Sequence, residues 1–265
     1  MNALEATDLR YAYPDGTLAV DGVDLSVERG ERIALLGPNG AGKSTVLQLL
    51  GGLIEPDSGR VRYFESTTDA DAIRDRLSVL TQNPADYLFN PTVREDLAYG
   101  PAQQDIPESE VDRRIERVVD RLDLGEMLSK PPFRLSGGQQ RRAALASALT
   151  VEPDLLLLDE PVSNVDAANR AEILRLLDEL TEAGVTLVTS TPDTELVPHV
   201  ADRVVLFGAD GTVAATGTTR EILTDTALLA DCDLRPPQVV RLFDGRERVP
   251  LTVAAAKRLL DVESE

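Results

Sequence analysis

The sequence contains a single cysteine, no tryptophan and no long apolar run. Cys232 therefore has no second thiol in the chain with which to form a disulfide. The longest apolar stretches, such as residues 155–158 and 204–207, are far shorter than the roughly 18 residues that a membrane-spanning helix needs. The N-terminus lacks the basic and apolar regions of a secretory signal. We therefore expect a protein of a reducing, cytoplasmic compartment that does not cross a membrane.

Positive charge is also scarce, and most of it is arginine. The chain has 46 acidic residues against 27 basic ones, a formal net charge of −19, with only three lysines. A field this negative repels the phosphates of nucleic acids and of anionic lipids, which disfavours nucleic-acid binding and direct docking on a membrane. The acids are spread along the chain and predict solvated surfaces. They favour adaptation to high salt, where counterions screen their repulsion, and an ordinary acidic protein is the alternative.

The pattern of apolar residues predicts an α/β fold. A chain of 265 residues that is 42% hydrophobic suits one large domain or two small ones. Alternating apolar positions over residues 3–13 and 18–28 predict an antiparallel pair of strands. Short apolar runs separated by helical periods predict a parallel sheet, interrupted by a helical insertion at 83–150. Short strands are expected at 33–36, 61–64, 77–80, 155–158, 185–189 and 204–207, and short helices at 239–243 and 253–260.

A glycine-rich segment lies between the strand at 33–36 and a helix expected at 45–50, with the spacing G-x-x-x-x-G-K-S/T. Glycines allow backbone N–H groups to turn inward around phosphate oxygens at the positive end of the helix. Lys43 adds a charge toward the β- and γ-phosphates, and Ser44 offers an oxygen ligand to Mg²⁺. The pattern predicts a site for ATP and Mg²⁺. Its residues are Gly37, Pro38, Asn39, Gly40, Ala41, Gly42, Lys43, Ser44 and Thr45.

Two acids end the apolar strand at 155–158. Asp159 and Glu160 would reach the carboxyl edge of the sheet, beside the glycine-rich segment. Phosphoryl transfer depends on positioning more than on covalent chemistry. We therefore expect Asp159 to hold Mg²⁺ through water and Glu160 to orient and partly deprotonate the attacking water. Alone, a strand that ends in two acids is weak evidence, but its place after the glycine-rich segment strengthens the assignment.

Residues 135–142 read LSGGQQRR, in which a serine and two glycines precede a helix expected to start near Gln139. This arrangement predicts a second anion-binding helix end, with an ordinary capped helix as the alternative. With this motif the sequence resembles the ATP-binding cassette (ABC) ATPases. The resemblance implies a head-to-tail dimer, in which the motif of one chain closes on the γ-phosphate held by the other. The lid residues would be Ser136, Gly137, Gly138 and Gln139.

Three further positions match this family. Tyr13 lies where the family stacks an aromatic ring on adenine, although either Tyr13 or Tyr11, expected on the opposite face of the same strand, could be core packing. Gln82 matches the residue that senses the γ-phosphate and Mg²⁺, which makes it a catalytic candidate with Lys43 and Glu160. Asp166 matches a dimer-contacting loop and also suits a helix cap, and both roles are compatible.

Within the family, the sequence resembles the ATPases of energy-coupling factor transporters, including the cobalt and nickel uptake branch. The resemblance lies in residues 82–86, in 92–101 and in the Arg-Pro-Pro run at 235–237. It implies that the segment after Gln82 touches a coupling helix of a transmembrane subunit, and that the C-terminal extension helps two ATPases to pair. The implied function is uptake of a micronutrient, a cobalt or nickel ion or a vitamin, powered from the cytoplasmic face of the membrane.

One position departs from the family pattern. Where the family has a histidine after the strand near residues 186–189, this chain has Pro192. Proline has neither a side-chain donor nor a backbone N–H, so it cannot hydrogen-bond a γ-phosphate. Proline also suits the start of a helix. His199, the only histidine, lies seven residues further on and is expected to face solvent.

Pro192 leaves the activity open between several interpretations. One is slow hydrolysis, with Thr191 or water in place of the histidine, and another is a heterodimer whose partner supplies the competent site. A nucleotide-gated assembly module with little turnover is the competing function. A cassette protein acting on ribosomes or DNA is disfavoured by the net charge of −19.

The resemblance also implies the organisation of the chain. We expect a P-loop NTPase core of the RecA-like α/β type, an N-terminal antiparallel β subdomain and an ABC helical subdomain at about 83–150. Residues 1–225 would form the ATPase domain, and residues 226–265 a short helical C-terminal extension. Partners would be a second ATPase chain and transmembrane subunits.

Overall fold

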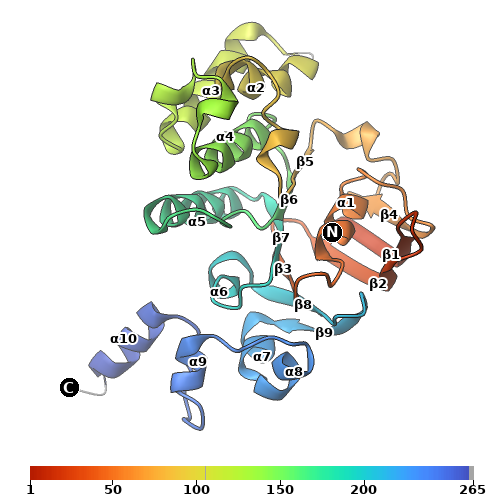
Figure 1. Ribbon diagram of the computed structural model, residues 1–265, viewed down its shortest axis with the longest axis vertical. Helices are drawn as coiled ribbons and strands as arrows, with labels where there is room; N and C mark the ends of the chain where they lie inside the picture. The colour runs from red at the N-terminus through yellow and green to blue at the C-terminus, as the bar shows by residue number, and fades with distance from the viewer. Residues whose placement is uncertain (105, 263–265) are drawn as a thin grey trace.

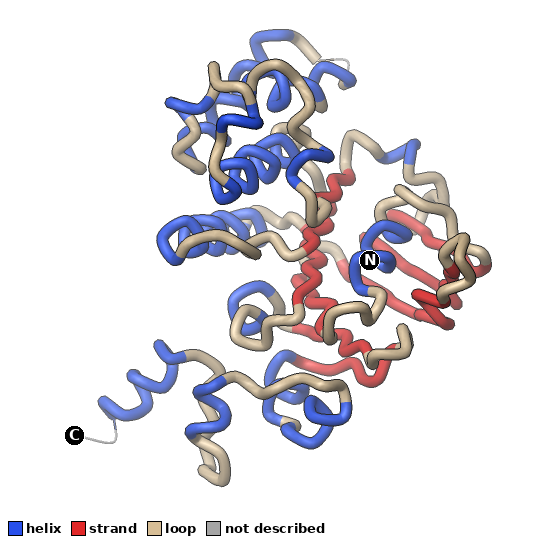
Figure 2. The backbone as a smooth tube through the Cα atoms, in the orientation of Figure 1, coloured by secondary structure: helices blue, strands red, loops and turns tan. Residues whose placement is uncertain are grey.

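The computed structural model describes residues 1–104 and 106–262, which form two sheets with helices around them. Figure 1 shows the larger sheet at the centre, with the smaller sheet and α1 (Lys43–Leu50) on one side and α5 (Ala167–Glu182) and α6 (Val197–Val200) on the other. The same layers are visible in the backbone tube of Figure 2. The α/β class and the antiparallel N-terminal sheet predicted from the sequence are both confirmed.

The larger sheet has the strand order β5-β6-β7-β3-β8-β9, and its first five strands are parallel. Successive side chains of a strand point to opposite faces, and β3 follows this rule. Ile33 and Leu35 pack with α1 and the smaller sheet, whereas Ala34 and Leu36 pack with the helices of the opposite layer. The parallel strands are apolar on both faces because both are covered. Their bounds are β3 Arg32–Leu36, β5 Leu77–Leu80, β6 Leu155–Asp159, β7 Thr186–Thr191 and β8 Arg203–Phe207.

The smaller sheet consists of β2 (Leu18–Glu28), β1 (Asn2–Ala12) and β4 (Ser58–Tyr63), all antiparallel. Strand β4 begins three residues earlier than the apolar pattern indicates, because its exposed N-terminal half carries polar side chains. The edge strand β9 (Val213–Thr218), antiparallel to β8, was not predicted. Its run VAATGT is short in bulky apolar residues and half-exposed, so it lacks the signal of a buried strand.

Helices occupy most of the predicted insertion, which Figure 1 shows above the larger sheet. The motif LSGGQQRR lies at the start of one of them, so its position is set by this layer rather than by the sheet. The bounds are η2 Pro84–Asp86, α2 Val93–Tyr99, η3 Pro101–Gln103, α3 Glu108–Arg121, η4 Gly125–Met127, η5 Pro132–Arg134 and α4 Gly137–Leu149; η1, Asp71–Ile73, precedes β5.

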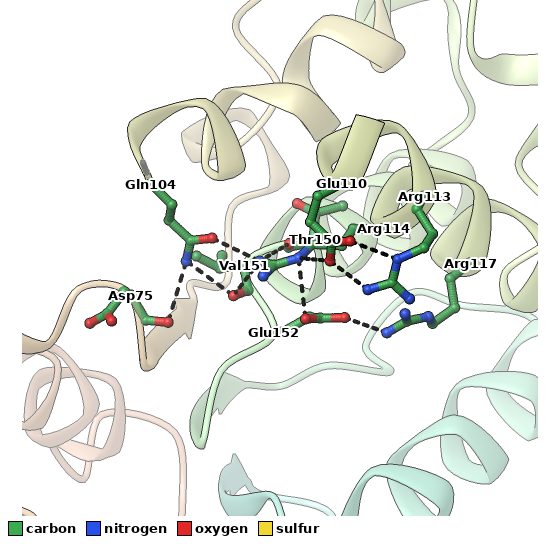
Figure 3. A network of polar contacts seen from close by, with 9 residues as sticks. All are labelled: Asp75, Gln104, Glu110, Arg113, Arg114, Arg117, Thr150, Val151 and Glu152. Atoms are coloured by element: carbon green, nitrogen blue, oxygen red, sulfur yellow. Dashed lines mark hydrogen bonds and ion pairs between the residues drawn. The ribbon is translucent and has the colours of Figure 1, made fainter. Parts of the chain in front are cut away.

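A polar network joins the helical layer to the sheet where α4 leads into β6 (Figure 3). Arg114, on α3, donates to the side chain of Gln104 at 2.7 Å and pairs with Glu110 and Glu152. Gln104 in turn donates to the carbonyl of Val151 at 3.1 Å. Because these contacts satisfy the backbone between α4 and β6, they fix how the helical layer sits against the sheet.

The C-terminal segment, residues 226–262, follows α7 (Thr219–Thr224) and contains α8 (Thr226–Asp231), α9 (Gln238–Leu242) and α10 (Val253–Val262). Helix α8 lies beside α7 at the edge of the larger sheet, and α9 and α10 extend away from it (Figure 1). The predictions of helices at 239–243 and 253–260 are confirmed, whereas α7 and α8, each of six residues, are too short to show a helical period. No helix among the described residues is long and apolar enough to cross a membrane.

Candidate functional site

Three neighbouring strands of the larger sheet end side by side. Strands β6, β7 and β3 are adjacent and parallel, with Asp159 opposite Ser190 and Leu36 opposite Thr191. The loop that follows β3 is the glycine-rich segment. Carboxyl ends of parallel strands form the crevice in which α/β proteins bind ligands. The glycine-rich segment, the acidic pair and the residue before Pro192 therefore meet at one edge.

The glycine-rich segment turns through two left-handed residues. Gly40 has φ +85° and Gly42 has φ +79°, conformations that side chains other than glycine rarely adopt. A Cβ on Gly42 would also overlap the carbonyl oxygen of Ala19 at the start of β2. Helix α1 begins immediately after Gly42, at Lys43, two residues earlier than predicted. This backbone directs the N-terminal end of α1 at the space above the sheet, as binding of a phosphate requires.

The side chain of Lys43 folds back onto the start of the glycine-rich segment. This side chain is 5% exposed, and its ammonium group donates to the carbonyls of Gly37 at 2.9 Å and Pro38 at 2.7 Å. Burial lowers the pKa of the ammonium group, and the nearby Glu160 and Asp159 partly oppose this by raising it. Partial desolvation strengthens the interaction of the ammonium group with a phosphate, whereas the negative charges of Glu160 and Asp159 offset part of it.

A cavity of about 490 Å³ opens over the glycine-rich segment. Its polar lining is rich in hydroxyl, amide and carboxylate oxygens, the hard ligands that Mg²⁺ prefers. The residues present therefore fit a triphosphate with Mg²⁺. No group of three or more His, Cys, Asp or Glu that could hold a metal occurs among the described residues. The cavity is lined by Tyr13, Thr17, Leu18, Ala19, Asn39, Gly40, Gly42, Lys43, Ser44, Thr45, Gln82, Glu160 and Pro192.

The acidic pair divides into a buried and an accessible member. Asp159 is 5% exposed and accepts a short hydrogen bond from the Ser190 hydroxyl. Glu160 lines the cavity, and its backbone N–H donates to the carbonyl of Ser190 at 3.2 Å. The φ of Glu160 is +48°, a strained conformation of the kind found at functional sites. The two carboxylates are thus placed differently, as the different roles predicted for them require.

Tyr13 stands at the mouth of the cavity, just beyond the end of β1. Its side chain is 40% exposed, and its hydroxyl group hydrogen-bonds that of Thr45 at 2.8 Å. The expectation that Tyr11 points to the opposite face is wrong. The two rings contact edge to face with centroids 5.3 Å apart, because residues two apart in extended chain project to the same side. Tyr11 packs against the core of the smaller sheet, which leaves Tyr13 as the accessible ring.

Arg141 joins the remaining predicted segments to the acidic pair, a role not predicted from the sequence. This side chain on α4 is 4% exposed and donates to the carbonyl of Thr81 at 3.1 Å and to Ser163 at 2.8 Å. Thr81 precedes Gln82, whose exposed side chain lines the cavity, and Ser163 donates to the carbonyl of Glu160. The second arginine of LSGGQQRR is not part of this link. The sequence carried no signal for this role, because the burial of Arg141 and the position of its acceptors depend on tertiary contacts.

The predicted lid residues lie outside the cavity lining. Ser136 caps α4, with its hydroxyl accepting from the N–H of Gln139 at 3.3 Å and the Gln139 side chain accepting from the N–H of Ser136. Helix α4 begins at Gly137 rather than near Gln139. Ser136 and Gly137 are exposed. Among the described residues, none of the four lid positions lines the cavity, so one chain brings together the loop, the acids and Gln82 but not the lid.

Two helix-related predictions have different outcomes. Asp166 caps α5, because its carboxylate accepts from the N–H groups of Ala168 and Asn169. Pro192 does not start a helix, since α6 begins only at Val197, and it lines the cavity instead. His199 is exposed, as predicted. Thr17, Leu18 and Ala19 also line the cavity, although nothing in their residue types predicted it.

Comparison with known proteins gives consistent matches over the whole chain. A model of the ABC transporter family matches residues 20–163. The energy-coupling factor transporter ATP-binding protein EcfA of Methanosphaera stadtmanae is 40% identical over 96% of both chains. The cobalt import ATP-binding protein CbiO of Rhodobacter capsulatus is 43% identical, covering 92% of this chain and 89% of CbiO.

Solved structures resemble this chain at lower sequence identity. The structure of cbiO1 from Clostridium perfringens, part of the ABC transporter complex cbiONQ, has a TM-score of 0.75 at 32% identity, covering 92% of this chain and 99% of the other. A dimeric ATP-binding cassette in a post-hydrolysis state, bound to ADP and Pi, has a TM-score of 0.75 at 27% identity, covering 82% of this chain and 99% of the other.

The two left-handed glycines provide a direct test of the loop geometry. Gly42→Ala should destabilise the chain by at least about 3 kcal/mol, because the added methyl group clashes with the Ala19 carbonyl and because alanine is strained in a left-handed conformation. Gly40→Ala is the control, since no atom lies within 4 Å of its added Cβ, and it should lose only about 1 kcal/mol. Urea unfolding without nucleotide measures both. Equal losses would contradict the described packing of the loop on β2.

Proposed function

The chain belongs to the ABC transporter family, and from this premise we propose that it is the ATP-hydrolysing subunit of an energy-coupling factor transporter. The observation that carries the proposal is the cavity, in which Lys43, Gln82 and Glu160 face one space above the glycine-rich segment. One site thus combines a phosphate cradle with a carboxylate able to activate water. The relatives named EcfA and CbiO support the transporter class.

We assign the chemistry to the residues as follows. The backbone N–H groups of residues 39–45 and the ammonium group of Lys43 would hold the phosphates. Ser44 and Gln82, which line the cavity, and the buried Asp159, through water, would hold Mg²⁺. Mg²⁺, when bound, neutralises charge on the phosphate oxygens. Glu160 accepts a proton from the water that attacks the γ-phosphorus, and ADP leaves in line with it. Tyr13, at the mouth, stacks on the adenine ring.

The site is completed by a second ATPase chain. Residues 136–139 are outside the cavity of their own chain. Ser136 and Gly137 are exposed at the start of α4, a helix of 13 residues whose N-terminal end can bind an anion. In a head-to-tail dimer, each lid would close on the γ-phosphate held by the other chain. The dimeric cassette bound to ADP and Pi supports this arrangement. The partner chain can be a second copy or a related ATPase.

The segment after Gln82 suits contact with a transmembrane subunit. Phe89 and Tyr99 are 57% and 51% exposed, and their rings pack edge to face with centroids 5.0 Å apart. Two exposed aromatic rings held together on the helical layer form an apolar contact point for a helix of a membrane partner. The net charge of −19 argues against direct attachment to anionic lipid, so attachment at the cytoplasmic face would occur through this partner.

Organisation and cargo complete the proposal. Residues 1–225 would form the ATPase domain, with the helical subdomain at about 83–150, and residues 226–265 the C-terminal extension. The transported micronutrient would be a cobalt or nickel ion or a vitamin, and the name of the cobalt import relative supports the metal branch.

Replacing the water-activating carboxylate should separate ATP binding from turnover. Glu160→Gln keeps the shape of the side chain but removes its basicity, so ATP turnover should fall at least about 100-fold. Because bound ATP is then not hydrolysed, ATP-bound dimers should accumulate, and analytical ultracentrifugation with Mg²⁺-ATP would detect them. Glu126→Gln, an exposed change on η4, is the control and should behave as the wild type. Normal turnover by Glu160→Gln would refute the assignment of the base.

Pro192 favours a second candidate function, a nucleotide-gated assembly module that closes on ATP with little turnover. Pro192 lines the cavity but offers no hydrogen-bond donor, and the exposed His199 does not line it. Glu160 therefore lacks the side-chain donor that the family pattern has at this position. Steady-state release of phosphate by the wild type distinguishes the two functions.

Restoring a donor at this position should speed hydrolysis. Pro192→His returns an imidazole to the cavity wall and should raise kcat about tenfold, since one donor to a phosphoryl transition state has effects of this order or larger. Pro192→Ala, which removes the ring without adding a donor, is the control. An unchanged rate in Pro192→His would mean that the position has no influence on turnover in this chain.

A further inference from the structure

The loop that carries Pro192 is tied to the C-terminal segment by two hydrogen bonds. Thr194, 7% exposed, donates its hydroxyl to the carbonyl of Arg235 at 2.8 Å. Next to it, the carboxylate of Glu195 accepts from the backbone N–H of Gln238 at 2.6 Å. These contacts join residues 41 and 43 positions apart in the sequence. They begin only two residues beyond the proline that lines the nucleotide cavity.

We call these two hydrogen bonds, Thr194 to Arg235 and Gln238 to Glu195, the joint. The C-terminal side of the joint is stiff. Pro236 and Pro237 lie between Arg235 and Gln238, and proline fixes φ and has no N–H group to donate. Pro237 is buried and precedes α9, so Gln238 is the first residue after Arg235 that can donate from its backbone. The run Arg-Pro-Pro thus holds an acceptor and a donor at a fixed spacing.

The loop side of the joint is organised by Asp193. Its N–H donates to the Thr191 hydroxyl at 3.0 Å, and its carboxylate accepts from the N–H of Glu195 at 2.9 Å and from Arg170 of α5 at 3.2 Å. Pro192, between these anchored residues, has no hydrogen-bond donor of its own. Its position in the cavity is therefore set by its neighbours.

The joint lies between two separate apolar cores. Before it, Cys232 and Leu234 are buried in the same core as Leu196, which follows the loop. After it, a small separate core holds α9 and α10 together, formed by Val239, Val240, Phe243 and Ala256. Leu251 packs against both cores, and Arg220 of α7 donates to the carbonyl of Val249, but residues 235–238 are the part of this segment that is hydrogen-bonded to the loop of Pro192.

We infer that Thr194 and Glu195 are positioning residues for ATP turnover, through which the C-terminal segment sets the place of Pro192 in the cavity. The inference rests on the proposed ATPase function. It adds to that function a role for the C-terminal segment in setting the rate of hydrolysis. A partner that holds α9 and α10 would thereby control the rate of hydrolysis without touching the nucleotide.

Gln238 allows one hydrogen bond to be removed with little other change. Gln238 is the first residue of α9, where proline is well tolerated, and Pro237 before it is already extended (φ −49°, ψ 146°), as a residue before proline must be. Gln238→Pro deletes the N–H that Glu195 accepts, whereas Gln238→Ala keeps it. Gln238→Pro should lower kcat at least about threefold against Gln238→Ala, with the KM for ATP unchanged.

Hydrogen exchange provides a readout that does not depend on turnover. With Mg²⁺-ATP bound, the amides of residues 191 and 193–196 should exchange faster in Gln238→Pro than in Gln238→Ala. Equal kcat values in two folded variants would overturn the inference. If the wild type released no phosphate, the proposed ATPase function would fail instead, and exchange alone would decide: faster exchange supports the joint, and equal exchange overturns it.

Thr194 has a matched control elsewhere in the chain. Thr194 and Thr219 are each 7% exposed, and the Thr219 hydroxyl donates to the carbonyl of Ala201 at 2.7 Å. Thr194→Val and Thr219→Val should therefore lower the urea midpoint to a similar extent. Only Thr194→Val should lower kcat, again about threefold. Equal effects of the two substitutions on kcat would mean that Thr194 contributes only to stability, which would contradict the inference.

Discussion

The site depends on the path of the backbone between β3 and α1. Two left-handed glycines turn the chain there, and the buried ammonium group of Lys43 braces the turn by donating to the carbonyls of Gly37 and Pro38. Backbone N–H groups point at an anion only while this turn is held. The fit is tight on one side, because the Ala19 carbonyl leaves no room for a side chain at Gly42. The first residues of β2 thus take part in shaping the proposed phosphate site.

Around this loop, a few partly buried polar contacts connect elements that are distant in sequence. Arg141 links the helix of the lid motif to the residue before Gln82 and to the loop after Glu160. Arg170 and the C-terminal segment hold the loop of Pro192 from two other directions. Each of these connections ends at the edge where the three parallel strands meet. A displacement of the helical layer or of the C-terminal segment would therefore shift residues that line the cavity.

The predictions that succeeded depended on local signals, and those that failed depended on tertiary context. The glycine-rich segment, the acidic pair and the apolar strands could be predicted because a turn, a buried strand and a helix end each require particular residue types at fixed spacing. The edge strand β9 and the short helices α7 and α8 carry no such signal. Thr17, Leu18 and Ala19 line the cavity only because β2 packs on the loop, and the contact of Thr194 with Arg235 arises from the fold over 41 residues.

One chain supplies the loop, the acids and Gln82, while the four lid residues lie outside the cavity lining. Completion of the proposed site therefore requires a second chain. A crystal structure of the chain with Mg²⁺ and a non-hydrolysable ATP analogue tests this requirement most directly. We predict a head-to-tail dimer in which Ser136 and Gly138 of one chain donate to the γ-phosphate on the other, at about 3 Å. A nucleotide-bound structure in which residues 136–138 contact no phosphate would contradict the account.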